Sequence, residues 1–111
     1  MYAAAFEMSS WLGVQEYVFE GESPEEIMSR FEQVQDLGCL VRMGRSEENA
    51  AGQKQLDKLE AFLEKYYEGN LTPEDIKTLN VKISIGAFRC LGIAEGEEEI
   101  GALRQKYPGV N

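Results

Sequence analysis

A long amphipathic segment, Ser46 to Gly69, limits what this chain can fold into. Drawn as a helix, it gathers its apolar side chains within an arc of about 140° and its charged side chains opposite. The apolar arc holds Leu56, Leu59, Phe62, Leu63, Tyr66 and Tyr67. Ser46 fits an N-cap and Gly69 fits a left-handed C-terminal residue. The segment predicts a helix over residues 46–68, roughly 33 Å long, about the full width of a domain of this size.

The length of the chain predicts one domain over residues 1–111. Its 43% hydrophobic and 28% charged residues are typical of a folded globular protein. No apolar run approaches the roughly 20 residues of a membrane span. The N-terminus lacks the basic start and long apolar core of a signal peptide. We therefore expect a cytoplasmic protein with no membrane contact.

Further helices are marked by capping signals. Ser23-Pro24 and Thr72-Pro73 each place a capping side chain before a proline at the first helical position. A last helix begins with acidic residues and ends with basic ones, as the helix dipole favours. Together with the long segment, the predicted helices are 24–37, 46–68, 73–79 and 96–107.

Strands are predicted where apolar residues alternate or form short buried runs. The predicted strands are 2–8, 14–20, 39–43 and 81–88. The first two would form an antiparallel hairpin, although the three consecutive alanines favour a helix and a helix over 10–20 competes. Residues 73–91 can also be drawn as one helix.

These elements predict an α+β fold in which about four helices pack on a small antiparallel sheet of three or four strands. An all-α arrangement is the alternative, and it follows if 10–20 and 81–91 are helical. Two near-repeats, 16–21 with 64–69 and 37–44 with 85–92, are each offset by 48 residues. Each member of the first pair is followed by a proline-led helix start, and internal duplication and chance similarity of two capped helix starts are both open explanations.

The chain contains no histidine, which removes Ser-His and Cys-His pairs and most zinc sites. Cys39 and Cys90 lie in apolar surroundings and are expected to be reduced, buried thiols. We therefore predict no catalytic residue, no metal ligand and no cofactor, and a protein that is not an enzyme.

The net charge of −9 is concentrated in two blocks. Residues 16–37 carry seven carboxylates against Arg30, and residues 95–99 carry four carboxylates. Such a surface repels nucleic acid and anionic membranes and favours basic protein partners. Direct nucleic-acid binding is not expected.

The predicted function is a small non-enzymatic protein–protein interaction module, an adaptor or inhibitor, that binds a basic protein surface. This prediction requires the carboxylates to gather on one part of the surface around an aromatic anchor. The predicted partner-binding residues are Glu20, Glu22, Glu25, Glu26, Glu95, Glu97, Glu98, Glu99, Tyr66 and Tyr67. Trp11, Tyr17 and Phe19 are weighed as further anchors, but core packing is the default for them.

Two other functions stay open. A nucleic-acid-mimicking inhibitor of viral or anti-defence type would carry its carboxylates along one face at a spacing near that of phosphates. A small-ligand binder or carboxylate-based enzyme would need a deep pocket and a carboxylate of shifted pKa. A homodimer formed through leftover apolar helix surface is compatible with each of these functions.

Overall fold

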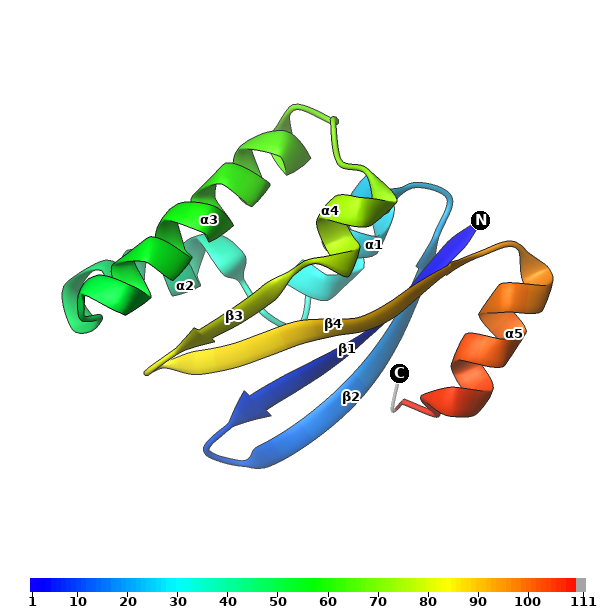
Figure 1. Ribbon diagram of the computed structural model, residues 1–111, viewed down its shortest axis with the longest axis horizontal. Helices are drawn as coiled ribbons and strands as arrows, with labels where there is room; N and C mark the ends of the chain where they lie inside the picture. The colour runs from blue at the N-terminus through cyan, green and yellow to red at the C-terminus, as the bar shows by residue number, and fades with distance from the viewer. Residues whose placement is uncertain (110–111) are drawn as a thin grey trace.

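The computed structural model describes residues 1–109 and shows an α+β domain (Figure 1). Within these residues, five helices pack on a four-stranded antiparallel sheet of order β2-β1-β4-β3. In chain order the elements are β1 (Tyr2–Ser10), β2 (Gly13–Gly21), α1 (Pro24–Glu32), α2 (Leu37–Glu47), α3 (Ala50–Tyr67), α4 (Pro73–Lys77), β3 (Asn80–Ile83), β4 (Gly86–Glu95) and α5 (Glu97–Lys106). The predicted fold class and the hairpin at residues 2–20 are confirmed.

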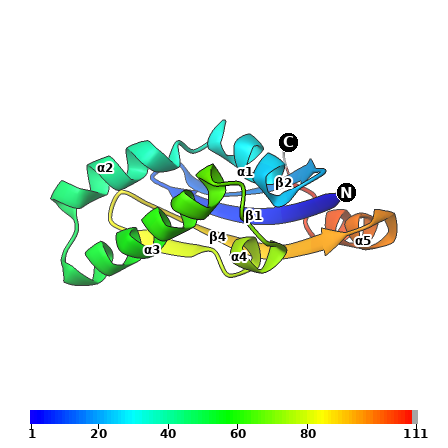
Figure 2. The same ribbon diagram turned by 90° about the horizontal axis from the view of Figure 1, so that it is seen from above.

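The helices divide between the two faces of the sheet. Helices α1 to α4 bury the main core against one face, and Figure 2 looks onto this helical layer. Helix α5 packs Ile100 and Leu103 against the opposite face, at the right-hand end of the molecule in Figure 1. The half of that face beyond α5 is not covered by any helix of residues 1–109.

The central strand β1 is covered on both faces at its N-terminal half, and its sequence reflects this. Ala3 and Ala5 face α5, while Ala4 and Phe6 face the main core. Ala3, Ala4 and Ala5 are fully buried. Small side chains let both helical layers approach the strand, and this packing outweighs the helix propensity of three alanines. The Phe6 and Phe31 rings then meet edge to face, with their centroids 4.8 Å apart.

The predicted strand over 39–43 is wrong, because these residues belong to α2. The Asp36 carboxylate accepts a hydrogen bond from the Cys39 N–H at 3.0 Å and begins this helix. Leu37, Leu40, Val41 and Gly44 share its buried face. The helix predicted over 24–37 accordingly ends at Glu32.

Other boundaries also differ from the prediction, most of all those of the long helix and of the strand over 81–88. The long helix begins at Ala50, because the Asn49 side chain accepts the Gly52 N–H at 3.0 Å, and Ser46 lies in the last turn of α2. The predicted strand over 81–88 is a hairpin, β3 and β4, whose turn lies at Ser84 and Ile85.

The near-repeats do not adopt similar structures. Residues 16–21 lie in β2, whereas 64–69 cover the end of α3; residues 37–44 lie in α2, whereas 86–92 lie in β4. The structures of these segments therefore give no support to an internal duplication.

The outer edge of β3 is covered by side chains from the helical layer. The Lys82 N–H donates to Gln55 Oε1 at 2.6 Å, and the Ser84 N–H donates to Glu48 Oε1 at 3.0 Å. Helix α3 and the turn before it thus supply hydrogen-bond acceptors to this edge of the sheet.

Candidate acidic interface

The register of the sheet brings the two acidic blocks together. Tyr2 at the start of β1 pairs with Glu95 of β4, and Ala3 pairs with Glu20 of β2. Because neighbouring strands lie about 4.8 Å apart, the backbones of Glu20 and Glu95 lie roughly 10 Å apart on either side of β1. The Gly96 N–H donates to the Met1 carbonyl at 3.0 Å, which fixes the turn into α5 beside this strand.

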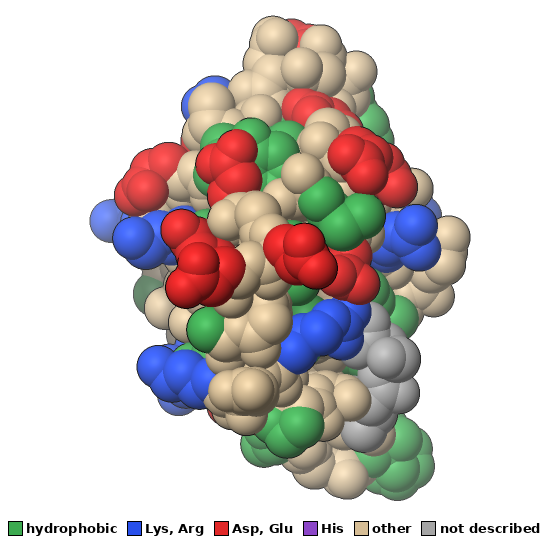
Figure 3. Space-filling model, turned by 90° about the vertical axis from the view of Figure 1, so that its right-hand side faces the viewer, with side chains coloured by type: hydrophobic (Ala, Val, Ile, Leu, Met, Phe, Trp, Pro, Cys, Tyr) green, Lys and Arg blue, Asp and Glu red, His purple; other side chains and the backbone are tan. Residues whose placement is uncertain are grey.

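The remaining carboxylates lie near this end of the sheet, because α1 and α5 begin where β2 and β4 end. Gly96 has φ of 87°, a left-handed value that glycine adopts without strain, and it turns the chain directly into α5. We call the resulting surface the acidic end. It comprises Glu20, Glu22, Glu26, Glu95, Glu97, Glu98 and Glu99. Figure 3 views the molecule from this side and shows acidic side chains gathered, with lysine and arginine side chains around them.

Basic neighbours neutralise only part of this charge. Arg104 Nη2 donates to Glu20 at 2.7 Å, and Arg30 Nη2 lies 3.5 Å from the Glu26 carboxylate. Glu99 accepts the Glu95 N–H at 3.2 Å.

Other carboxylates of the acidic end face solvent. Glu22, Glu95, Glu97 and Glu98 are exposed, and no ion pair or hydrogen bond within residues 1–109 engages their carboxylates. The acidic end therefore presents uncompensated negative charge on a fixed backbone framework.

Glu25 is not among these free groups. Its Oε2 accepts the Leu71 N–H at 2.7 Å in a half-buried position. The bond ties the first turn of α1 to the loop between α3 and α4. The structure thus gives this predicted partner-binding residue a role inside the protein.

Tyr66 and Tyr67 lie away from the acidic end, at the C-terminal end of α3. Their ring centroids are 5.3 Å apart, and Tyr67 is 68% exposed. Burial and the neighbouring Glu32 charge raise the pKa of Tyr66, and burial raises the pKa of Glu32. These residues form a separate patch at the contact between α1 and α3.

The aromatic side chain that does lie at the acidic end is Tyr2, which the sequence did not single out. It is half-buried and lines a hollow of about 190 Å³ together with Pro73, Ile93 and Glu95. The position of Tyr2 could not be predicted from the sequence, because it depends on the pairing of β1 with β4.

At the opposite end of the strands, the expectation of core packing fails for Trp11. Its side chain is 92% exposed in the turn between β1 and β2, next to Leu12 at 72%. Phe19 is buried as expected, and Tyr17 is half-buried and stacks on it at 5.8 Å.

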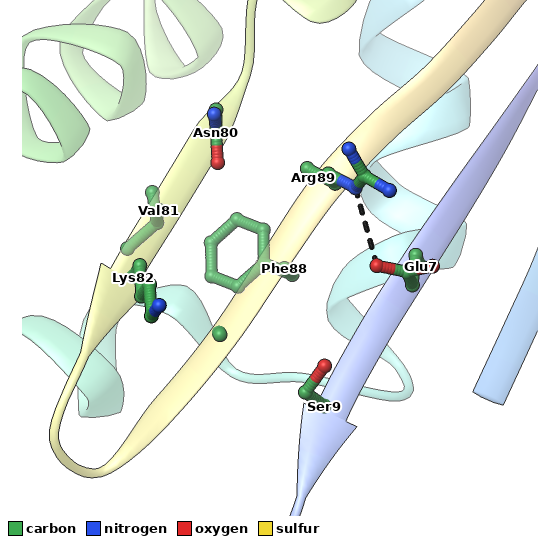
Figure 4. Close-up of a pocket in the computed structure, with 8 residues that line it drawn as sticks. Glu7, Ser9, Asn80, Val81, Lys82, Phe88 and Arg89 are labelled. Carbon is green, nitrogen blue, oxygen red and sulfur yellow. Dashed lines mark hydrogen bonds and ion pairs between the residues drawn. The ribbon is translucent and has the colours of Figure 1, made fainter. Parts of the chain in front are cut away.

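An open hollow of about 390 Å³ lies on the half of the sheet that α5 leaves uncovered (Figure 4). Arg89 Nε donates to Glu7 Oε1 at 3.1 Å across it, and Lys82, Asn80 and Ser9 lie around it. Glu32, whose carboxyl pKa is raised by burial, lies on the other face of the sheet and does not line this hollow.

No protein-family model, curated protein or solved structure matches this chain.

Among residues 1–109, no three histidine, cysteine, aspartate or glutamate side chains lie close enough to hold a metal ion. In the same range, no helix is both long and apolar enough to cross a membrane. Both thiols are free and half-buried, and burial raises the pKa of Cys90 to about 11.

Proposed function

We propose that this protein is a small non-enzymatic interaction module, an adaptor or inhibitor, that docks its acidic end on a basic surface of another protein. The observation that carries the proposal is the pairing of β1 with both β2 and β4. This pairing brings Glu20 of β2 and Glu95 of β4 to the same end of the sheet, on either side of β1.

The electrostatics of the acidic end support a docking role. Four of its carboxylates have no partner within residues 1–109, and all four are exposed. Exposed ion pairs contribute only about 0–1 kcal/mol each, so these charges act mainly on the association rate and on partner choice. The sheet and two helix starts fix the backbone that carries these carboxylates, so binding does not have to order that backbone.

Affinity then depends on an apolar contact within the charged surface. Tyr2, Pro73 and Ile93 supply one, because they line the hollow beside Glu95 and Glu99. A basic partner with an apolar side chain at the centre of its positive patch would fill this hollow while its lysines and arginines meet the surrounding carboxylates.

Affinity capture from the native host, with matched baits, tests this proposal. The wild-type bait is compared with Glu97→Gln/Glu98→Gln, which removes two unpaired charges from the acidic end. The control, Glu47→Gln/Glu64→Gln, removes the same charge from exposed positions on α2 and α3. We expect the wild type and the control to retain a basic partner that roughly 0.5 M salt releases. The acidic-end variant should retain much less of it.

Retention of the same partner by all three baits would refute docking through the acidic end. Competition by duplex DNA or RNA for the captured partner would instead favour the nucleic-acid-mimicking inhibitor. Simultaneous binding of nucleic acid and this protein would exclude that mimic. Amide shifts in an NMR titration with the captured partner should be confined to residues around 20–22, 95–99 and Tyr2.

A further inference from the structure

The half of the sheet that α5 leaves uncovered carries two rows of side chains on one face. Residues that pair across antiparallel strands point to the same side of a sheet, so the strand register fixes each row. The rows lie two residues apart along each strand, and both therefore face away from helices α1 to α4. The first row is Ser9, Ala87 and Lys82, and the second is Glu7, Arg89 and Asn80.

Short side chains in the first row explain the hollow of about 390 Å³ on this face (Figure 4). Ser9 and Ala87 leave the space above them open, beside Lys82 and the ion pair of Glu7 with Arg89. Sites for small molecules usually measure roughly 300–1,000 Å³. The hollow therefore has the size of a site for a small ligand.

Two cations of the hollow can reach the same ligand group. Lys82 pairs with Ala87, two residues before Arg89, so Lys82 and Arg89 are diagonal neighbours across β3 and β4. Diagonal positions lie roughly 7–8 Å apart, which long side chains can span. Within residues 1–109 no ion pair engages Lys82, and no hydrogen bond engages Nη1 or Nη2 of Arg89. Both side chains therefore have donors free for one anion.

Two neutral side chains add donors to the same hollow. The Asn80 amide and the Ser9 hydroxyl line it, and neither side chain makes a hydrogen bond to another described residue. Together with a guanidinium and an ammonium group, they can donate to several oxygens of one ligand group. A phosphate monoester offers three acceptor oxygens and a charge of about −1.5 to −2, whereas a carboxylate offers two oxygens and a single charge. The donor set thus favours phosphate.

We propose that this hollow binds a small organic phosphate, a phosphate monoester, with the phosphate group between Lys82 and Arg89. The organic group would lie over Ser9 and Ala87, whose short side chains leave room for it. The site is separate from the acidic end and does not depend on the partner that the acidic end binds.

The charges that line the hollow permit an anion to bind. Its two cations, Lys82 and Arg89, outnumber its one carboxylate, Glu7. Glu7 accepts a hydrogen bond from Arg89 Nε at 3.1 Å, on the side of the guanidinium away from the free Nη groups. The hollow therefore keeps a net positive charge in a protein whose total charge is −9.

Other carboxylates lie farther from the phosphate position. Glu16 pairs with Glu7 and lies two strands from Arg89, roughly 10 Å away. Glu95, at the acidic end, lies six residues along β4 from Arg89, roughly 20 Å or more than two Debye lengths at physiological salt. Glu48 accepts hydrogen bonds from the Ser84 N–H at the edge of β3 and does not line the hollow.

Titration of the full chain with phenyl phosphate, followed in ¹H–¹⁵N NMR spectra, tests this proposal. The titration would run at constant ionic strength and about pH 7.5, where the monoester is mostly a dianion. We expect amide shifts at Ser9, 80–82 and 87–89 that saturate with a Kd on the order of 1 mM, since a ligand of this size at an open site binds weakly. Benzoate has the same ring with a carboxylate, and it should bind at least about fivefold more weakly.

Three substitutions locate the site. Lys82→Ala should raise the Kd at least about tenfold, because it removes a charge-assisted hydrogen bond. The control Lys77→Ala removes an exposed lysine from α4, on the other face of the sheet, and should leave the Kd unchanged. Glu7→Gln keeps an acceptor for Arg89 but removes the negative charge, so it should lower the Kd about threefold or more. All these side chains are at least partly exposed, and circular dichroism would confirm that each variant folds.

Any of four results would overturn the proposal. The first is the absence of saturation up to roughly 20 mM phenyl phosphate. The second is equal affinity for benzoate, which would leave no preference for phosphate. The third is a Kd in Lys82→Ala equal to that of the wild type. The fourth is a Kd that Glu7→Gln does not lower, which would place the anion outside the hollow.

Discussion

The hydrogen bond between Glu25 and Leu71 predicts a stability effect that separates this carboxylate from the others near it. Glu25 Oε2 accepts the Leu71 N–H at 2.7 Å, and Leu71 is only 7% exposed. In Glu25→Ala the amide keeps its burial but loses its acceptor. Such a loss costs about 1–3 kcal/mol, and we expect about 2 kcal/mol here. Glu25→Gln keeps a neutral acceptor and should cost about 1 kcal/mol.

Urea and thermal unfolding followed by circular dichroism measure these costs. A change of 1 kcal/mol shifts Tm by about 4–8 °C in a domain of this size, so Glu25→Ala should lower Tm by about 10 °C. The control is Glu97→Ala, the same change in the first turn of α5, where the carboxylate has no partner within residues 1–109. It should lose less than about 1 kcal/mol, the usual value of a helix-dipole interaction.

Equal stability of Glu25→Ala and Glu97→Ala would refute the structural role assigned to Glu25. Hydrogen exchange gives an independent check. The Leu71 amide should exchange faster in Glu25→Ala than in the wild type, after correction for global stability. Unchanged exchange at this amide would show that another group satisfies it.

Three further effects follow from the packing and the ionisable groups. Gly44→Ala should destabilise the protein by about 1–3 kcal/mol in urea unfolding, because the added Cβ would lie 2.9 Å from Leu56 Cδ1. Burial raises the pKa of Cys90 to about 11, so in a variant whose other cysteine is serine, thiol labelling at pH 8 should be slow until urea unfolds the chain. Burial alone would raise the pKa of Asp75, but hydrogen bonds from Thr72 and an ion pair with a lysine of α3 lower it overall. The wild type should therefore be more stable than Asp75→Asn at neutral pH. That difference should disappear as the pH falls below about 4, through the lowered pKa, in unfolding curves measured from pH 2 to 7.

The sequence predicted best those elements whose own residues decide them. Ser23 and Thr72 begin α1 and α4 as predicted, since each side chain accepts an N–H from the third residue beyond it. The strand predicted over residues 39–43 is wrong because its short apolar run belongs to the buried face of α2. Gly44 lies inside α2, where its lack of a side chain lets Leu56 pack closely. That role depends on a distant residue, which local patterns do not show.

The candidate site shows the same division. The sequence revealed two acidic blocks, but their meeting depends on the pairing of Ala3 with Glu20 and of Tyr2 with Glu95. The hydrogen bond from the Leu71 N–H to Glu25, 46 residues away in the chain, could not be predicted from the sequence either. The alternation of apolar and polar residues in β1 and β2 predicted a hairpin. It could not show that the Trp11 side chain in the turn is exposed and does not pack in the core.

The acceptors that α3 and its preceding turn offer to β3 have a consequence for the partly folded protein. An uncovered strand edge is a template on which another chain can add a strand, and this is a common start of aggregation. Gln55 and Glu48 occupy that edge at the amides of Lys82 and Ser84. Any state in which α3 detaches while the sheet persists would therefore expose the template. Early docking of α3 would keep this edge covered while the rest of the protein folds.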